Sequence, residues 1–190
     1  MDLKEVIESV ENELKDLKTG NLNKDCDELN DKIMKRTVTR GNIFVYGAGR
    51  SGFVGKSFVM RLVQLGFRAY MIGESATAPM KKDDLFIVIS GSGKTQIVQD
   101  ILEISSRNKV KIVLISAEKV EHEKVYMNII IGGKSKTSPD EKILPLGSHF
   151  EINALIFLDS LIFKLIKGYN LEEKVEKISR MYREDRIPII

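Results

Sequence analysis

Apolar residues recur along the chain at two periods, and the change between them separates a helical beginning from a sheet-forming middle. Near the start, apolar positions three and four residues apart form one stripe of an amphipathic helix, made of Leu3, Val6, Ile7, Val10, Leu14 and Leu17. Gly20 and Asn21 are expected to end this helix. A second helix is predicted from about residue 24 to residue 38, with Leu29, Ile33 and Val38 facing inward.

From residue 42 onward, short and mostly continuous apolar runs replace the helical spacing. They predict five strands covered on both faces, at 43–46, 69–72, 85–89, 111–115 and 127–131. Helical patterns lie at 53–65 and 95–107, and a shorter one is predicted at 117–125. Alternation of strands and helices is typical of a parallel sheet with right-handed crossovers. The predicted fold class is therefore α/β, a five-stranded parallel sheet in an α/β/α sandwich with two leading helices.

The last third of the chain is predicted to be helical after a loop at 132–147. A helix at about 148–167 carries apolar residues on more than one face, which indicates a central position or a subunit interface. A final helix is expected at 171 to about 182, and the apolar tail at 187–190 is a candidate for docking on a partner subunit. We expect one domain over residues 1–190, with a helical arm (1–41), a core (42–167) and a C-terminal helix and tail (168–190).

Composition excludes several classes of protein. With 190 residues and 43% hydrophobic content, the chain can bury one substantial core. A net charge of +3, from evenly mixed charges, argues against a nucleic-acid or membrane-surface partner. Cys26 is the single cysteine and there are two histidines, so neither a disulfide nor a metal site is expected. The beginning of the chain lacks a signal-like apolar stretch, and no apolar run is long enough to span a membrane. We expect a cytoplasmic protein.

The first predicted strand ends in a glycine-rich loop, Gly47-Ala48-Gly49-Arg50-Ser51-Gly52, which enters a helix. Its G-x-G-x-x-G spacing matches a dinucleotide-binding loop, where a glycine backbone and a helix N-terminus receive phosphate. A dinucleotide fold also wants an acidic residue closing the second strand, and Glu74 fits that position poorly because Gly73 precedes it. A nicotinamide-dependent dehydrogenase is therefore a distant alternative.

The third predicted strand ends in a second loop, Ser90-Gly91-Ser92-Gly93-Lys94-Thr95, which again enters a helix. A nucleotide-binding P-loop is excluded because the glycine that it requires five positions before Gly93 is Val88 here. What remains is a neutral set of hydroxyl and backbone N–H groups, suited to a phosphate monoester. Alternatively, these hydroxyl residues only cap the following helix.

At this loop the chain resembles the sugar isomerase (SIS) domain family, whose mark is S-x-S-G-x-T after a parallel strand. It is also similar to the 6-phospho-3-hexuloisomerase branch of that family, in the first glycine loop and in Met60-Arg61-Leu62, Leu65-Gly66-Phe67, Gly73-Glu74 and the segment 144–151, Leu-Pro-Leu-Gly-Ser-His-Phe-Glu. The resemblance implies a sheet of order 2-1-3-4-5. It also implies a cofactor-free interconversion of two phosphorylated ketohexoses, 3-hexulose 6-phosphate and fructose 6-phosphate, by a homo-oligomer, a tetramer or dimer, in the ribulose monophosphate pathway.

The resemblance also implies roles for individual residues. Glu151 would be the general base that passes a proton through an enediol, although a glutamate in the first turn of a helix also suits the helix dipole. Ser90, Ser92 and Thr95, with Gly91 and Gly93, would hold the phosphate. Gly49, Arg50 and Ser51 would meet the sugar or its enediolate oxygen, with a surface cation as the alternative for Arg50. Glu74 and Thr77 are further candidate substrate contacts.

One departure concerns histidine. The family carries an Arg-His pair near its C-terminus, whereas this chain has none between Ser179 and Arg186. His149, beside the expected base, is a candidate for the missing imidazole, with a polar residue at the helix start as the alternative.

Two other functions stay open, namely another aldose–ketose phosphosugar isomerase and a non-catalytic sugar-phosphate-binding SIS domain. The DNA-binding module typical of such regulators is not recognisable in the first 41 residues.

Overall fold

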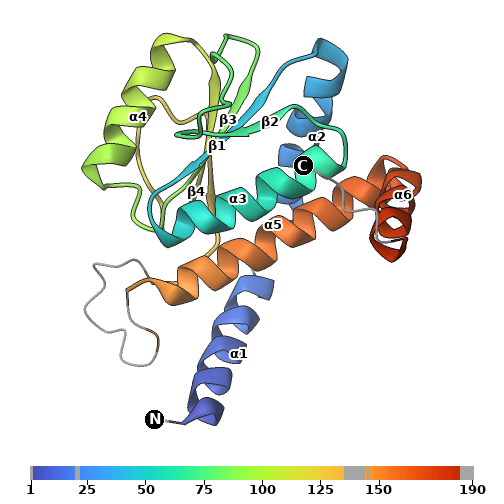
Figure 1. Cartoon of the computed structure of the whole chain (residues 1–190). Coiled ribbons are helices and arrows are strands. Elements are labelled where there is room, and N and C mark those ends of the chain that lie inside the picture. The colour runs from blue at the N-terminus through green and yellow to red at the C-terminus, as the bar shows by residue number, and fades with distance from the viewer. Residues whose placement is uncertain (1, 20–21, 135–143, 145, 185–190) are drawn as a thin grey trace.

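The centre of the protein is a parallel sheet, seen in a computed structural model that describes residues 2–19, 22–134, 144 and 146–184 (Figure 1). Its five strands follow the order β2-β1-β3-β4-β5. They are β1 (Ile43–Gly47), β2 (Ala69–Met71), β3 (Leu85–Ile89), β4 (Lys111–Ser116) and β5 (Met127–Ile130). Ile43 pairs in register with Ala69 on one side and with Leu85 on the other. The predicted sheet and its strand order are confirmed.

Helices cover both faces of the sheet, and each face has its own hydrophobic core. The described helices are α1 (Leu3–Thr19), α2 (Leu22–Thr39), α3 (Arg50–Gln64), α4 (Gln96–Arg107), α5 (Ser148–Gly168) and α6 (Glu172–Arg183). Strand side chains alternate between the faces. Val45 and Ile87 pack in one core with residues of α2, α3 and α5. Phe44 and Phe86 pack in the other core with residues of α4.

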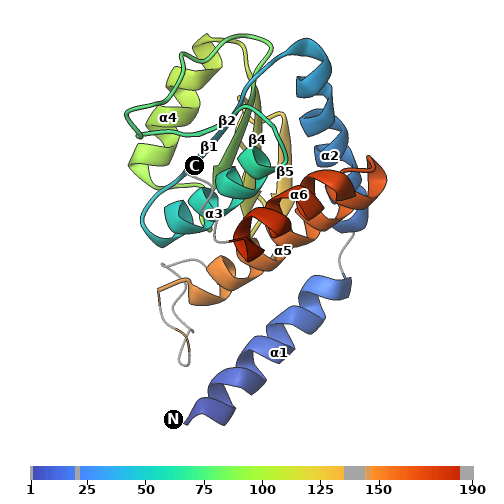
Figure 2. The ribbon, with the colours of Figure 1, turned by 45° about the vertical axis from the view of Figure 1, so that its right-hand side comes forward.

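Helix α5 runs beside α3, and α1 projects away from the sheet past the beginning of α5 (Figures 1 and 2). One side of α5 is buried, as its apolar composition predicts. Large apolar side chains are nevertheless exposed on these helices, namely Leu3 and Ile7 on α1, Phe53, Met60 and Val63 on α3, and Leu155, Ile156 and Phe163 on α5. Exposed apolar side chains therefore lie on three helices, of which α1 and α3 each contact α5.

The predicted helix at 117–125 is wrong, because the connection from β4 to β5 consists of bends and turns. The side chain of Asn128 accepts a hydrogen bond from the Val120 backbone N–H at 2.8 Å, and Val120 itself is buried in the core on the α4 side. The local pattern of residues in this segment is typical of a helix. The bond to Asn128 and the burial of Val120 hold the segment in another conformation.

The predicted inward position of Val38 is also wrong, since its side chain is 84% exposed. The inward face of α2 continues from Leu29 and Ile33 to Arg36. Arg36 is buried because its guanidinium donates a hydrogen bond to the backbone carbonyl of Asp83. A charged residue whose guanidinium is bonded to a backbone carbonyl takes the inward position that hydropathy alone assigned to valine.

Two sequence predictions fall on parts of the chain that the structure does not describe, the helix end at Gly20 and Asn21 and the tail at 187–190. Among the described residues, no helix combines the length and apolar character needed to cross a membrane.

Candidate active site

The two glycine-rich loops meet at the carboxyl end of the sheet, where β1 and β3 are neighbours. The chain leaves β1 toward β2 on one side, while β3 begins the other half of the sheet, so this is a topological switch point of the kind where open α/β sheets bind ligands. A pocket opens there, lined by Ala48, Ser51, Ile89, Ser90, Gly91, Ser92, Thr95, Gly147, Phe150 and Glu151. Three segments far apart in sequence thus form one site.

The second loop forms one wall of this pocket. The Ser90 hydroxyl accepts a hydrogen bond from the Gly93 N–H, and the Ser92 hydroxyl accepts one from the Lys94 N–H, each at 3.2 Å. A hydroxyl that accepts in this way keeps its own hydrogen to donate to a ligand. Thr95 is the N-cap of α4, yet its side chain makes no capping hydrogen bond. The geometry therefore leaves hydroxyl donors and the first N–H groups of α4 to receive an anion.

Glycines allow both loops to fold tightly. A Cβ atom at Gly47 would lie 2.7 Å from the backbone of Ser51, and one at Gly52 would lie 2.6 Å from the carbonyl oxygen of Gly47. Gly49 and Gly93 have φ angles of 59° and 61°, a region that other residues rarely adopt. Gly49 and Gly93 do not line the pocket, and their positive φ angles shape the two loops that do.

Glu151 lies in the first turn of α5 and lines the same pocket as the serines. Its side chain is 4% exposed, and its Oε2 accepts a hydrogen bond from Nε of Arg50, whose own side chain is 64% exposed. The other oxygen, Oε1, is buried with no hydrogen-bond partner among the described residues. Arg50 therefore binds one oxygen of the candidate base, and the other oxygen has no hydrogen bond within the described part of the chain.

His149 lies two residues before Glu151 in sequence but outside the lining of the pocket. It is 8% exposed, and its Nε2 is 2.9 Å from the hydroxyl of Ser9 on α1. The structure thus brings His149 together with the N-terminal helix.

Glu74 and Thr77 also lie outside the pocket lining. The Glu74 carboxylate pairs with the ammonium group of Lys56 on α3 at 2.7 Å. The Thr77 hydroxyl lies 2.8 Å from the carbonyl oxygen of Met71 and 2.7 Å from that of Glu74. In the structure Glu74 is therefore paired with α3, and Thr77 is bonded to the backbone at the end of β2 and in the loop that follows it.

Sequence reasoning singled out most of the polar lining but missed Ala48, Ile89, Gly147 and Phe150. Gly147 precedes α5 with a φ of 84°, and a glycine just before an apolar helix is a signal that points to such a tight turn.

Among the described residues, no group of three or more histidine, cysteine, aspartate or glutamate side chains is arranged to hold a metal ion.

Comparison with known proteins identifies close relatives. The SIS domain model matches residues 38–122. A 3-hexulose-6-phosphate isomerase of Methanocaldococcus jannaschii is 37% identical over 172 residues, which cover 89% of this chain and 92% of that protein. The 3-hexulose-6-phosphate isomerase of Bacillus subtilis is 33% identical, covering 92% of this chain and 95% of that protein.

A solved structure agrees with these matches in fold. It is a Methanococcus jannaschii protein for which a molecular function of 3-hexulose-6-phosphate isomerase was inferred. The similarity has a TM-score of 0.79 at 37% identity, over 91% of this chain and 96% of that one.

Proposed function

The chain belongs to the SIS-domain family of 3-hexulose-6-phosphate isomerases and is a phosphosugar isomerase, and we propose that it interconverts 3-hexulose 6-phosphate and fructose 6-phosphate through an enediol. The observation that carries this proposal is the pocket that the buried Glu151 and the serine loop line together. Such a pocket combines an anion cradle with a base, as the reaction requires. The single cysteine, Cys26, is a buried free thiol, which agrees with a cytoplasmic location.

In the proposed mechanism, the phosphate binds at Ser90, Ser92, Thr95 and the first N–H groups of α4. Glu151 Oε1 then removes the proton from C2 of the 3-hexulose, the electron pair forms the C2–C3 double bond, and the C3 carbonyl oxygen becomes an enediolate oxygen. The hydroxyl proton of the C2 oxygen passes to the C3 oxygen, the C2 oxygen then forms the new carbonyl, and the electron pair of the double bond takes the proton back from Glu151 at C3. One carboxylate can perform both transfers because the two carbons are adjacent.

Arg50 supports this chemistry from the side of Oε2. Its guanidinium donates a hydrogen bond to that oxygen, and we propose that this contact orients the carboxylate for proton transfer. We also propose that the guanidinium stabilises the developing enediolate, where a positive charge lowers the energy of the transition state. Ser51, which is buried in the pocket wall, is proposed to contact the sugar hydroxyls.

The proposed reaction is tested by proton NMR of fructose 6-phosphate with the purified protein in heavy water. We expect deuterium to enter at C3 and a 3-ketose to appear. Exchange at C1 with an aldose product would identify an aldose–ketose isomerase in place of this activity. Broadening of the sugar signals without exchange would contradict catalysis and identify a sugar-phosphate-binding protein.

Replacing Ser92 by alanine is expected to raise the KM for the sugar phosphate roughly tenfold with little change in kcat, because one hydroxyl donor to the phosphate is lost while the base is untouched. Steady-state kinetics measure both constants. Ser106→Ala, near the other end of α4, is the matched control and should leave both unchanged. An unchanged KM in Ser92→Ala would contradict the placement of the phosphate.

We also propose that the chain forms a homo-oligomer, a dimer or tetramer, through the exposed apolar side chains of α1, α3 and α5. Phe53 and Phe163 are 71% and 61% exposed, and apolar surface shared by neighbouring elements is typical of an interface. Light scattering is expected to give a mass of two or four times 21.5 kDa. A monomeric mass at micromolar concentration would rule this out.

A further inference from the structure

Helix α1 makes one hydrogen bond to the beginning of α5 and one to the segment that follows β5. The Ser9 hydroxyl lies 2.9 Å from Nε2 of His149, and Oε1 of Glu13 accepts a hydrogen bond of 2.6 Å from the backbone N–H of Gly133. Ser9 and Glu13 are four residues apart, so they lie on the same face of α1. One face of α1 therefore contacts both α5 and the chain that leaves β5.

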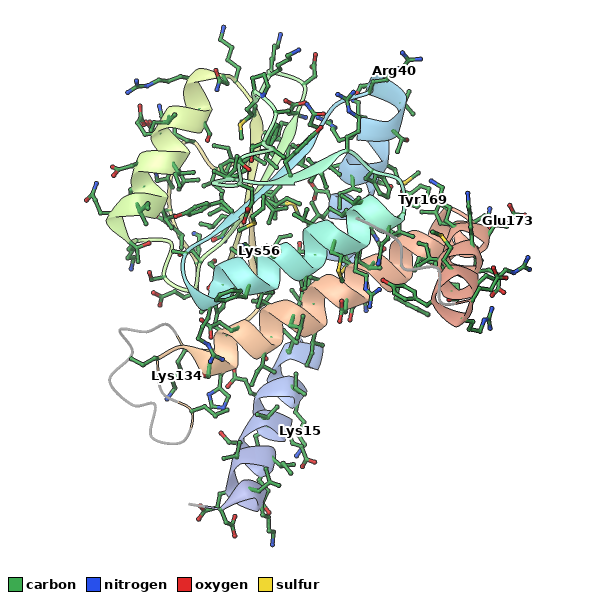
Figure 3. All side chains as sticks on the ribbon, in the orientation of Figure 1. Lys15, Arg40, Lys56, Lys134, Tyr169 and Glu173 are labelled. Atoms are coloured by element: carbon green, nitrogen blue, oxygen red, sulfur yellow. The ribbon has the colours of Figure 1, made fainter. Side chains whose placement is uncertain are left out.

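Gly133 is packed directly on the first turn of α5. A Cβ atom at Gly133 would lie 2.5 Å from the backbone nitrogen and Cα of Phe150. One turn further, the side chain of Asn153 donates a hydrogen bond of 2.9 Å to the carbonyl of Ile131. The start of α5 is thus held between the segment after β5 and α1. Figure 3 shows Lys134, which follows Gly133, beside this end of α5.

Glu151 lies in this same turn, directly after Phe150. Its position relative to the serine loop depends on the placement of the turn, because its side chain is buried and Arg50, its hydrogen-bond partner, is mostly exposed. Apolar contacts of α1 tolerate sliding, whereas hydrogen bonds have narrow ranges of distance and angle. The two polar contacts are therefore suited to fix the turn in one position.

We propose that Ser9 and Glu13 are positioning residues that hold the first turn of α5, and with it the Glu151 carboxylate, at the distance from the phosphate site that proton transfer requires. This inference rests on the function proposed above. In this proposal Ser9 holds the turn through its hydrogen bond to His149. Helix α1 therefore contributes to catalysis without touching the substrate. A small displacement of a base is costly, since a misplacement of about 1 Å can lower a rate roughly 100-fold.

The test compares Glu13→Ala, Glu13→Gln and the wild-type chain in steady-state kinetics. We expect Glu13→Ala to lower kcat roughly 10- to 100-fold and to leave KM within about twofold, because the phosphate site lies on other loops. Glu13→Gln keeps an oxygen that accepts the Gly133 N–H and should restore most of kcat. Glu11→Ala removes an exposed carboxylate from the same helix and is the matched control, with no expected change.

A second pair of variants, at Ser9, keeps the test informative if Glu13→Ala does not fold. Ser9→Ala is expected to lower kcat with KM retained, and Ser9→Thr, which keeps the hydroxyl, is expected to restore it. Thermal melting separates positioning from stability, since a purely structural role would lower the melting temperature and leave kcat unchanged well below it. An unchanged kcat in Ser9→Ala or Glu13→Ala would overturn this inference alone. A wild-type chain without isomerase activity would overturn the proposed function and this inference with it.

Discussion

Replacing Glu151 by glutamine is expected to lower kcat by roughly 10²- to 10⁴-fold, the usual contribution of a positioned general base. Glutamine keeps the size of the side chain but has no proton-accepting carboxylate. Sugar-phosphate binding should persist, because the serine loop that receives the phosphate is unaltered. Turnover is measured by NMR, and binding is measured by phosphorus NMR titration or calorimetry.

Glu173→Gln provides the matched control for this variant. Glu173 also lies in the first turn of a helix, α6, but it is exposed and far from the pocket (Figure 3). If Glu151 served only to complement the dipole of its helix, the two variants would lose a few tenths of a kcal/mol to about 1 kcal/mol of stability and keep their activity. Retained turnover in Glu151→Gln would therefore exclude Glu151 as the base.

Replacing Gly47 by alanine is expected to destabilise the fold by about 1–3 kcal/mol, with a fall in melting temperature of roughly 2–12 °C. The added Cβ would lie 2.7 Å from the carbonyl carbon and oxygen of Ser51 and 2.9 Å from the nitrogen of Gly52. Because these are backbone atoms, no side-chain rotation relieves the contact. The first loop must shift, and this displaces Ser51 and Arg50 at the pocket.

Gly168→Ala is the control for this prediction. Gly168 is the last residue of α5, and a Cβ atom there has no neighbour within 4 Å. Alanine in a helix is favoured over glycine by up to about 1 kcal/mol, so this variant should melt at the same temperature or slightly higher. Calorimetry measures both. A Gly47→Ala variant as stable as the wild-type chain would show that the loop adapts at little cost.

The sheet and half of the pocket could be predicted from sequence because they depend on local patterns. Continuous apolar runs mark strands buried on both faces, and the carboxyl ends of parallel strands necessarily share one edge of the sheet. With the strand order that the resemblance implies, this rule puts the loop after β1 beside the serine loop after β3. It also led to Glu74 and Thr77, which follow β2, but Glu74 pairs with Lys56 on α3 and Thr77 bonds to the carbonyl of Met71.

Contacts between distant segments could not be predicted in the same way. Arg50 and Glu151 are 101 residues apart, and Ser9 and His149 are 140 apart, so nothing in local spacing pairs them. The helix predicted at 117–125 is wrong for a related reason. The hydrogen bond from the Val120 N–H to the side chain of Asn128 holds this segment in another conformation, although its local pattern favours a helix. Each of these features depends on the packing of whole elements against one another.

The projection of α1 from the body has a consequence for how activity responds to heat. A helix that packs on the rest of the chain along a short stretch opens at a lower free energy than the strands of a central sheet. If α1 undocks while the sheet stays folded, the turn that carries Glu151 loses its support and turnover stops. The temperature optimum of the enzyme would then lie below its global melting temperature, with an inactive but folded state between them.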